Sequence, residues 1–504
     1  MNSIRLQNFR SFRDTGTIEL RPLTILVGAN SSGKSSFLRF FPLMKQTVEA
    51  FSSAPLLWNG RYVDFGDFAS IAHRGAKDPN VILTFELPGG AIANDDTGSK
   101  LTLTLCEQDS KTRISRLSLV LGEDTCELNV DSSGQVQTFL AGKQNVLELT
   151  PSVASEFPNP PLLQPIAGSI SPGLQWDSLQ LRVDQELKKS IDDLTHANTS
   201  AQSKDWLLQQ LRYFARPSSF HEHLKALDGG KHWERKLAGT APTSPRIQRM
   251  RRLLFAKTIP NILMQGSRWL TFTGQSVSYI APFRKDPARF DRKQELSVLQ
   301  IDPRGDNLAM FLLSLSKADR EDFDQWTAQH FGFGIKIEST VSHVSILVDD
   351  GKGAFNLIDM GYGISQVLPV IAQCWLGTKR RPFYKRGFGT SSPPILTAIE
   401  QPELHLHPRL QTNLADLFVG VLNATQANNP TQSRLLSPTR LLIETHSEPL
   451  ISRLGELVSE GKLDRKDCSV VMFHKDDKGV TQVRSTEFDE DGMLSEWPPG
   501  FLSA

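Results

Sequence analysis

The chain has 504 residues, enough for several domain-sized units, and 39% hydrophobic with 22% charged residues is a globular composition. Lys and Arg (56) nearly balance Asp and Glu (55), so any surface for nucleic acid must be a local patch, and no membrane contact is expected. The four cysteines are widely spaced, which disfavours a disulfide framework. The sequence shows no apolar signal core and no run of roughly 18 apolar residues, so a cytoplasmic protein is expected.

The first part of the chain, residues 1–150, is predicted to consist mainly of strands and turns. An apolar strand over residues 18–27 leads into a Gly/Ser loop, and a helix is expected over residues 35–50. Alternating runs bounded by Asp, Gly and Ser clusters then predict antiparallel hairpins, with strands over 81–87, 101–106, 114–121 and 125–130.

The middle and the last third of the chain differ in pattern. Apolar spacing of three and four predicts helices from residue 184 to about residue 258. Strands and helices then alternate, which predicts a parallel α/β sheet. The expected strands are 344–348, 394–399 and 440–443, and the expected helices are 363–376 and 410–422.

The most specific single motif is GANSSGKS at residues 28–35, which fits G-x-x-x-x-G-K-[ST] between an apolar strand and a helix. Its glycines let the backbone curl so that N–H groups face phosphate oxygens, and the helix N-terminus adds positive potential. Lys34 can reach the β and γ phosphates of ATP, and the Ser35 hydroxyl can bind Mg²⁺. The alternative is a chance Gly/Ser loop, which the flanking strand and helix disfavour.

Two strand ends supply further candidates. Residues 395–408 read ILTAIEQPELHLHP, an apolar strand followed by an acid and a Pro-containing turn. A P-loop NTPase needs an acid at a neighbouring strand end to hold Mg²⁺, which makes Glu400 the candidate. His446, at the tip of the RLLIETHS strand, could hydrogen-bond the γ-phosphate and sense its loss, although a lone strand-end histidine is more often structural.

Three segments leave alternatives open. DMGYGISQ at residues 359–366 is either a second anion cradle or an ordinary turn with a helix cap. His405 and His407 could bind a metal, but their spacing in a turn favours packing at a dimer interface. RIQRMRRLLFAK at residues 246–257 is the candidate for nucleic acid contact, and a solvated basic face or a protein-docking helix is the favoured interpretation.

These motifs, in this order, resemble the ABC-type ATPase heads of the RecF, SMC and OLD group, whose opening is similar to IRLQNFRSF. IEQPELHLHP and the closing DEDGMLSEWPPGF look more like stand-alone ATPases found beside nucleases in Septu-type and retron-linked anti-phage systems. The resemblance covers about residues 1–90 and 275–504. It implies an α/β fold with an ABC-type P-loop NTPase head, whose mixed and parallel sheet has flanking helices, plus an antiparallel β-rich lobe and an inserted helical subdomain.

The resemblance also implies a division of the chain and a set of site residues. Residues 1–150 and 276–504 become the two parts of the head, with the phosphate loop and β-rich lobe in the first part, and 151–275 becomes a mostly helical insertion. The implied ATP-binding residues are Asn30, Ser31, Ser32, Gly33, Lys34, Ser35 and Ser36, with the signature residues Gly361, Gly363, Ser365 and Gln366 capping ATP from the opposite subunit. The implied metal residues are Ser35 and Glu400, and the implied catalytic residues are Glu400, Gln401, Glu403 and His446, the last as switch histidine.

One position departs from the resemblance. Gln401 stands where many such heads carry a glutamate that orients water, and Glu403 lies two residues beyond it. Because a glutamine can orient water but cannot accept its proton, slow hydrolysis is expected.

The resemblance implies partners as well. Such heads close on each other around two ATP molecules, which implies a homodimer or larger assembly. The segment after His446 is too short for the Toprim nuclease domain of OLD proteins. We therefore expect this chain to control a separately encoded nuclease of HNH type. Further expected partners are a retron reverse transcriptase and its multicopy single-stranded DNA. The alternatives are a RecF-like DNA-binding repair clamp and an ATP-binding scaffold without useful hydrolysis.

Overall fold

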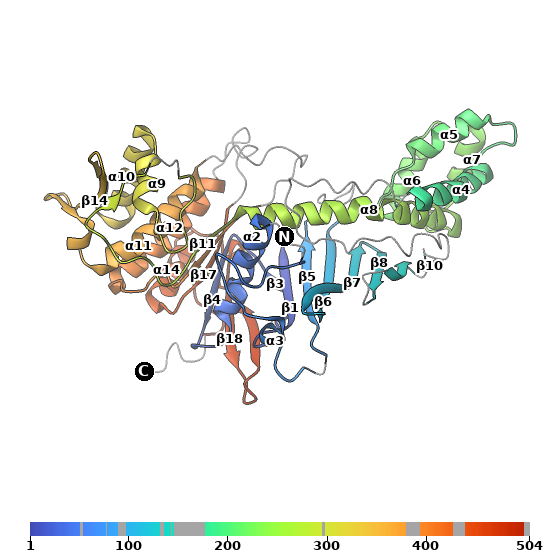
Figure 1. Ribbon diagram of the computed structural model, residues 1–504. Helices are drawn as coiled ribbons and strands as arrows, with labels where there is room; N and C mark the ends of the chain where they lie inside the picture. The colour runs from blue at the N-terminus through green and yellow to red at the C-terminus, as the bar shows by residue number, and fades with distance from the viewer. Residues whose placement is uncertain are drawn as a thin grey trace. The chain divides into compact units, whose positions relative to one another are not determined.

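A computed structural model describes ten segments of the chain: residues 1–50, 54–76, 78–88, 97–131, 136–142, 144–145, 177–294, 298–379, 394–426 and 439–497. Their contacts divide the chain into two compact units. Unit 1 comprises Met1–Phe9, Thr47–Leu57 and Asp67–Phe272, and unit 2 comprises Arg10–Gln46, Trp58–Gly66 and Thr273–Ala504. Figure 1 labels many of the elements of both units.

The central sheet of unit 2 has the order β11-β16-β17-β4-β18-β19 among the described residues. Its strands are β11 Val277–Ile280, β16 Ile395–Glu400, β17 Thr439–Glu444, β4 Leu23–Gly28, β18 Cys468–Lys475 and β19 Thr481–Thr486. All neighbours are parallel except β19, which runs antiparallel to β18. Strands β4 and β16 are buried along their whole length, as parallel strands covered on both faces are. The predicted parallel α/β sheet is confirmed.

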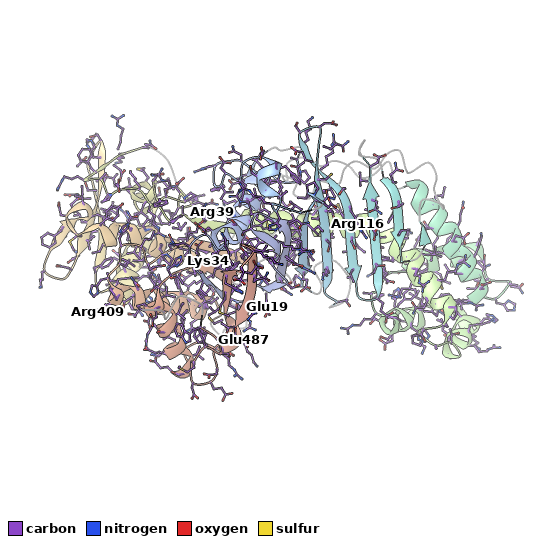
Figure 2. All side chains as sticks on the ribbon, turned by 90° about the horizontal axis from the view of Figure 1, so that it is seen from below. Glu19, Lys34, Arg39, Arg116, Arg409 and Glu487 are labelled. Carbon is purple, nitrogen blue, oxygen red and sulfur yellow. The ribbon has the colours of Figure 1, made fainter. Side chains whose placement is uncertain are left out.

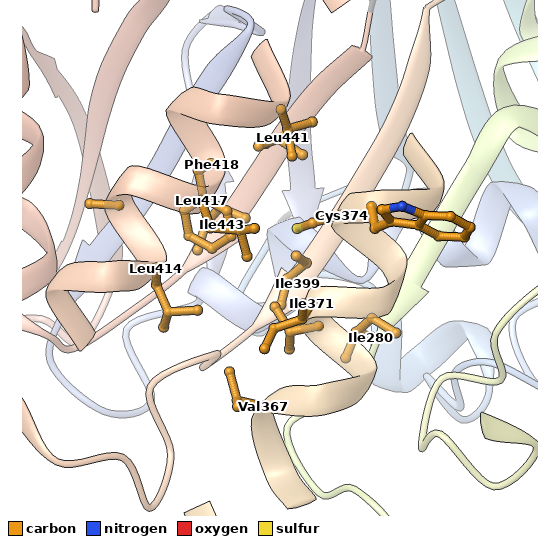
Figure 3. Packing of buried hydrophobic residues seen from close by; sticks show 14 of the residues in the cluster. Ile280, Val367, Ile371, Cys374, Ile399, Leu414, Leu417, Phe418, Leu441 and Ile443 are labelled. Atoms are coloured by element: carbon orange, nitrogen blue, oxygen red, sulfur yellow. The ribbon is translucent and has the colours of Figure 1, made fainter. Parts of the chain in front are cut away.

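Helices cover this sheet and form the core of unit 2. They include α1 Lys34–Leu38, α2 Phe40–Glu49, α11 Tyr362–Thr378, α12 Pro408–Gln426 and α14 Glu448–Ser459. Helix α11 packs on β16 and α12 packs on β17, and Figure 3 shows Ile371 of α11 and Phe418 of α12 with Ile399 and Ile443 of the strands in one buried cluster. Each such side chain contributes about 1.5–3 kcal/mol when fully buried, so this core fixes the strands that carry the site.

Smaller elements complete unit 2. The strands are β2 Phe12–Asp14, β3 Ile18–Glu19, β12 Asp291–Arg292, β13 Gly334–Ser339, β14 His343–Asp349 and β15 Ala354–Asn356, and the helices are α9 Leu308–Ser314 and α10 Lys317–Phe331, with short 3₁₀ turns at Leu357–Asp359 and Arg465–Asp467. Strand β14 pairs antiparallel with β12, β13 and β15. The predicted strand at 344–348 is therefore confirmed, at the centre of a small separate sheet.

Unit 1 is built from antiparallel strands and a set of helices. The strands are β1 Ser3–Phe9, β5 Val81–Leu87, β6 Ser99–Gln108, β7 Lys111–Leu121, β8 Asp124–Val130, β9 Val136–Ala141 and β10 Gln144–Asn145, each antiparallel to its neighbour in the order β1-β5-β6-β7-β8-β9-β10. Burial alternates along β6, with Leu101, Leu103 and Leu105 inward, because successive side chains of a strand point to opposite faces. The predicted hairpins are confirmed.

The helices of unit 1 confirm the predicted helical stretch. They are α3 Phe68–Ile71, α4 Asp177–Leu194, α5 Ala201–Gln210, α6 Pro217–Ala226, α7 Gly230–Ala238 and α8 Pro245–Ser276, and α8 runs past the predicted end near residue 258. The contacts group the β-rich lobe with these helices, and the phosphate loop with the C-terminal part of the chain. The three-part division at residues 150 and 275 stays a prediction. Among the described residues, no helix combines the length and apolarity needed to cross a membrane.

Candidate nucleotide-binding site

The GANSSGKS loop joins β4 to α1 at the carboxyl end of the parallel strands, where ligands bind in open α/β sheets. Gly28 has φ 142° and Gly33 has φ 108°, which L side chains rarely adopt. A Cβ on Gly28 would lie 2.1 Å from the carbonyl oxygen of Phe473, and one on Gly33 would lie 2.7 Å from Ser11 Oγ. Only glycine fits at these two positions, so the motif is also a geometric requirement of the turn.

The predicted ATP-binding residues 30–36 all lie in this turn or in the first turn of α1. Asn30 and Ser31 are exposed, whereas Ser32 is buried. The carbonyl of Ser32 accepts a hydrogen bond of 2.8 Å from the Thr481 hydroxyl, so β19 anchors the loop. The loop is therefore attached to a strand of the central sheet through its buried residue Ser32.

Lys34, which Figure 2 labels, begins α1 and contacts the backbone of the phosphate loop. Its side chain is only 3% exposed, and Nζ donates to the carbonyl oxygens of Gly28 and Ala29, each at 2.9 Å. Burial lowers the pKa of Lys34, while Glu444 and Glu403 oppose that shift. A cation is thus placed where the loop backbone curls, which is the position expected for contact with phosphate.

Two buried carboxylates end the neighbouring strands β16 and β17, and Glu400 and Glu444 are paired in register. Ser35 Oγ donates to Glu444 Oε1 at 2.8 Å. Glu400 instead accepts from Arg39 Nε and Nη2 at 2.7 and 2.8 Å and from the Tyr279 hydroxyl at 2.7 Å. The two predicted metal residues, Ser35 and Glu400, therefore have different partners, and Glu444, which sequence reasoning missed, is the carboxylate bound to Ser35.

The electrostatics of the two carboxylates differ accordingly. Burial, followed by the neighbouring charge of Glu400, raises the pKa of Glu444 to about 7, against the opposing effects of Ser35 and Lys34. The hydrogen bond to Glu400 raises the pKa of Arg39, so that side chain remains a cation. Burial raises the pKa of Tyr279, which stays a neutral donor. Glu400 accepts two hydrogen bonds from Arg39, whereas no arginine among the described residues donates a hydrogen bond to Glu444.

The turn after Glu400 is fixed by hydrogen bonds to its backbone. Gln401 has φ 43°, and its N–H donates to the carbonyl of Glu444 at 2.8 Å. Arg284 Nη2 donates to the carbonyl oxygens of Glu400 and Gln401 at 2.8 and 3.3 Å. Arg284 was not identified from the sequence, because a single arginine after a strand carries no recognisable pattern.

The other two predicted catalytic residues lie in the same place. Glu403 Oε1 accepts from the His446 N–H at 2.6 Å, which joins the ends of β16 and β17. Burial, together with the charge of Lys34, lowers the pKa of His446 to about 4, so the imidazole is neutral near pH 7. The structure thus brings Glu400, Gln401, Glu403 and His446 together beside the phosphate loop, while their catalytic roles stay predictions.

Several polar atoms at this site are buried without a hydrogen-bond partner among the described residues: Glu403 Oε2, Glu444 Oε2, and Nε and Nη1 of Arg284. Such an atom costs about 1–3 kcal/mol, and in native proteins it often marks a functional site. Burial lowers the pKa of Arg284 to about 10 and raises that of Glu403.

Within the described chain no cluster of three or more His, Cys, Asp or Glu side chains is arranged to hold a metal. These residues fit Mg²⁺ bound through one or two carboxylates, a hydroxyl and nucleotide phosphates.

The DMGYGISQ segment forms a turn and the start of α11. Gly361 caps the helix with φ 83°, and a Cβ on Gly363 would lie 2.7 Å from the carbonyl oxygen of His405. Ser365 and Gln366 are buried, and they donate to the carbonyls of Tyr362 (2.7 Å) and Lys285 (3.3 Å) respectively. Asp359, Gly361 and Tyr362 of this segment are exposed; Tyr362 is 43% exposed and was not predicted. Capping of ATP by this segment stays a prediction.

The two histidines of the LHLHP turn make local contacts. The His405 ring lies 4.8 Å from the Tyr362 ring, and His407 Nδ1 accepts from the Arg409 N–H at 3.3 Å. Both side chains are exposed. The WPPGF end of the chain lies outside the described residues beyond Trp497.

The basic segment 246–257 lies on α8 in unit 1, where acidic side chains pair with its cations. The ion pairs are Arg246–Asp193 (3.9 Å), Arg249–Glu186 (2.7 Å), Arg251–Asp124 (2.5 Å) and Lys257–Asp184 (2.6 Å). Arg251 is only 2% exposed. Less charge is therefore available to phosphates than the sequence indicates, and nucleic acid contact stays a prediction.

A glycine-rich loop at the head of a helix, a buried lysine and carboxylates on adjacent parallel strands define a P-loop NTPase. Residues 1–220 match the family model described as AAA ATPase domain, and residues 193–453 match the one described as AAA domain, putative AbiEii toxin, Type IV TA system. The second match spans just over half of the chain, so the chain belongs to that family. The protein is an ATPase of the AAA type, with an α/β P-loop head as predicted.

Solved structures of SMC heads are similar at low identity. An SMC head bound to the C-winged helix domain of ScpA is 11% identical, with 97% of this chain and 98% of that chain covered and a TM-score of 0.36. A head with an extended coiled coil from Pyrococcus furiosus is 11% identical (96% and 96% covered, TM-score 0.33), and one from Thermotoga maritima is 10% identical (96% and 97%, 0.31). A search of curated proteins found no match. The assignment rests on the family match and the geometry of the site.

Proposed function

We propose that this protein is a slow ATPase that keeps ATP bound for long periods and uses its nucleotide state to control a separately encoded nuclease in anti-phage defence. The observation that carries the slow step is Gln401. Gln401 directly follows Glu400, where many similar ATPases carry a glutamate. Hydrogen bonds with the Glu444 carbonyl and Arg284 fix its backbone at this position. An amide can orient water but leaves its proton without an acceptor, which slows hydrolysis.

The defence role is supported by the IEQPELHLHP resemblance and by the family description, which names a putative toxin of a type IV toxin–antitoxin system.

A phosphate loop on one chain leaves the γ-phosphate open to water, so pairing of two heads is physically favourable. Exposed aromatic side chains flank the site: Phe283 is 80% exposed next to Arg284, and Tyr362 is 43% exposed at the start of α11. These side chains favour a second copy as the covering surface.

The nucleotide part of the proposal is tested by binding and turnover of ATP. Lys34→Ala removes the buried ammonium and is expected to abolish ATP binding measured by calorimetry. The matched control is Lys478→Ala, because Lys478 is exposed in the turn between β18 and β19. Equal ATP affinity of the two variants would remove the phosphate-loop assignment.

The control of a nuclease is tested with the purified ATPase and a nuclease that co-purifies with it. Cleavage of DNA or tRNA is followed while ATP is varied from absent to millimolar. If the ATP-bound form restrains the nuclease, cleavage falls as the ATP concentration rises. The size of the fall is limited by how much more tightly ATP binds the restraining state than the active state. Cleavage that ignores ATP, identical with wild type and Lys34→Ala, would overturn this role. Tight binding of gapped DNA by the protein alone would then favour the RecF-like repair clamp.

A further inference from the structure

The phosphate-loop hydroxyl and the strand-end carboxylates are paired in a way that the sequence motifs do not indicate. Ser35 Oγ lies 2.8 Å from Glu444 Oε1; Ser35 directly follows the buried Lys34, and the charge of Glu444 acts on the Lys34 ammonium. No hydrogen bond connects Ser35 with Glu400 among the described residues. Because the P-loop hydroxyl is itself a metal ligand, the carboxylate that it touches is the one nearest to the cation position.

Glu400 is already occupied by other groups. Both of its oxygens accept hydrogen bonds from Arg39, and Oε1 accepts a further bond from the Tyr279 hydroxyl. A bidentate guanidinium offsets the carboxylate charge. Glu400 therefore attracts a divalent cation less strongly than a carboxylate that is not bound to an arginine. Arg284 also holds the Glu400 carbonyl at 2.8 Å, which fixes the backbone at this point.

Glu444 has spare acceptor capacity in a buried place. Its side chain is 3% exposed, Oε1 accepts from Ser35, and Oε2 has no hydrogen-bond partner among the residues that the structure describes. A buried carboxylate oxygen without a partner is unfavourable unless a cation or a donor reaches it. Mg²⁺ binds through one or two carboxylates and completes its shell with phosphate oxygens and water.

We infer that Glu444, together with Ser35, is the carboxylate that holds the divalent cation of the nucleotide complex, directly or through a bound water, while Glu400 is a positioning residue fixed by Arg39 and Tyr279. This inference rests on the proposed nucleotide binding and reassigns the metal carboxylate from Glu400 to Glu444. In that arrangement Glu400 orders the turn that carries Gln401, and Glu444 links the phosphate loop to the strand that carries His446.

The test measures Mn²⁺, which occupies oxygen sites for Mg²⁺, bound to the full-length protein with a non-hydrolysable ATP analogue, by the loss of its free EPR signal. Glu444→Gln is expected to weaken Mn²⁺ binding by about tenfold or more, the range for residues that hold or orient a metal ligand. Glu400→Gln is expected to leave Mn²⁺ affinity within a few-fold of wild type while turnover falls. Glu448→Gln, the same change at an exposed position of α14, is the control.

Folding is checked by thermal unfolding without nucleotide. Glu444→Gln replaces a costly buried carboxylate by a neutral amide of the same shape, so the unfolding temperature is expected to stay the same or rise. Ser35→Ala and the double variant Ser35→Ala/Glu444→Gln supply a second test. If both residues serve one cation, their effects on Mn²⁺ affinity are not additive.

Three outcomes separate the possibilities. Loss of Mn²⁺ affinity in Glu444→Gln but not in Glu400→Gln supports the inference. The reverse pattern, or a Glu444→Gln protein with wild-type affinity, overturns it and leaves nucleotide binding in place. A wild-type protein that binds no ATP analogue, with or without Mn²⁺, overturns both the inference and the proposed function.

Discussion

Each unit contains a buried arginine among polar partners, and the two arginines differ in how completely they are satisfied. In unit 1, all three guanidinium nitrogens of Arg251 donate: to Asp124 at 2.5 Å, to the Ala215 carbonyl at 2.6 Å, and to Gln248 at 3.1 and 3.3 Å. In unit 2, Nη2 of Arg284 donates to two backbone carbonyls, whereas Nε and Nη1 are buried without a hydrogen-bond partner among the described residues.

The difference separates a structural network from a candidate ligand site. Asp124 also accepts from the Tyr213 hydroxyl at 2.8 Å, so the network around Arg251 is closed. Around Arg284, Glu403 and Glu444 each keep a buried oxygen without a hydrogen-bond partner in the part of the chain that the structure describes. Because unsatisfied buried atoms are costly, they persist where a ligand supplies the missing contacts. A buried charge alone therefore does not mark a site, and several charged groups that lack hydrogen-bond partners at one place are the better indicator.

The largest expected effect breaks the closed network. Arg251→Met leaves Asp124 buried without its cation, and removal of one partner of a buried ion pair typically costs about 3–5 kcal/mol. Unit 1 is expected to unfold at lower urea, with faster hydrogen exchange in β8 and α8. Arg249→Met is the matched control, since Arg249 is 64% exposed in its pair with Glu186 and exposed pairs contribute about 0–1 kcal/mol. Equal losses in the two variants would contradict the distinction.

The second prediction concerns the open site. Arg284→Met is expected to abolish most of the stabilisation of unit 2 by ATP, which for wild type is about 2.7 kcal/mol at a ligand concentration of 100 Kd. Arg251→Met, although less stable, is expected to keep the full ATP-induced shift in unfolding temperature. The measurement is thermal unfolding of both variants with and without ATP. An undiminished ATP shift in Arg284→Met would show that the unpaired atoms of Arg284 serve no ligand.

The third prediction concerns the turn that Arg284 holds. Gln401→Glu supplies a proton acceptor beside the attacking water, so steady-state phosphate release is expected to rise by about tenfold, equal to about 1.4 kcal/mol of barrier. Gln325→Glu, on the exposed face of α10, is the control for the added charge. A fall in turnover for Gln401→Glu alone would show that the amide is the better catalytic group here.

The sequence predicted what is local and missed what is assembled across the sheet. The strand at residues 81–87 matches β5 residue by residue, because alternation and turn residues lie within the segment itself. Glu444 was overlooked because only the pairing of β17 with β16 and β4 brings it to Ser35, 409 positions away along the chain. The burial of Arg251 was overlooked because the helical period does not show which face packs against a neighbour.

The smallest expected effect is on the pH dependence of stability, to which one histidine in each unit contributes. Burial lowers the pKa of His223 in unit 1 and of His330 in unit 2 from the ordinary value of 6.5. His223 Nε2 lies 3.0 Å from the Gln210 carbonyl, and the His330 ring lies 4.5 Å from that of Trp326. In the unfolded chain both rings bind protons more readily than in the folded one, so stability from these groups falls as the pH drops below 6.5.

His223→Gln and His330→Gln remove these titrations one at a time. Each variant is expected to lose less stability than wild type between pH 7 and pH 5, with the change confined to its own unit, because glutamine does not titrate. The measurement is urea unfolding across this pH range, followed by hydrogen exchange to separate the two units. A variant whose pH dependence matches wild type would show that the histidine is equally protonated in the folded and unfolded states. A change in the other unit would show that the two units do not unfold independently.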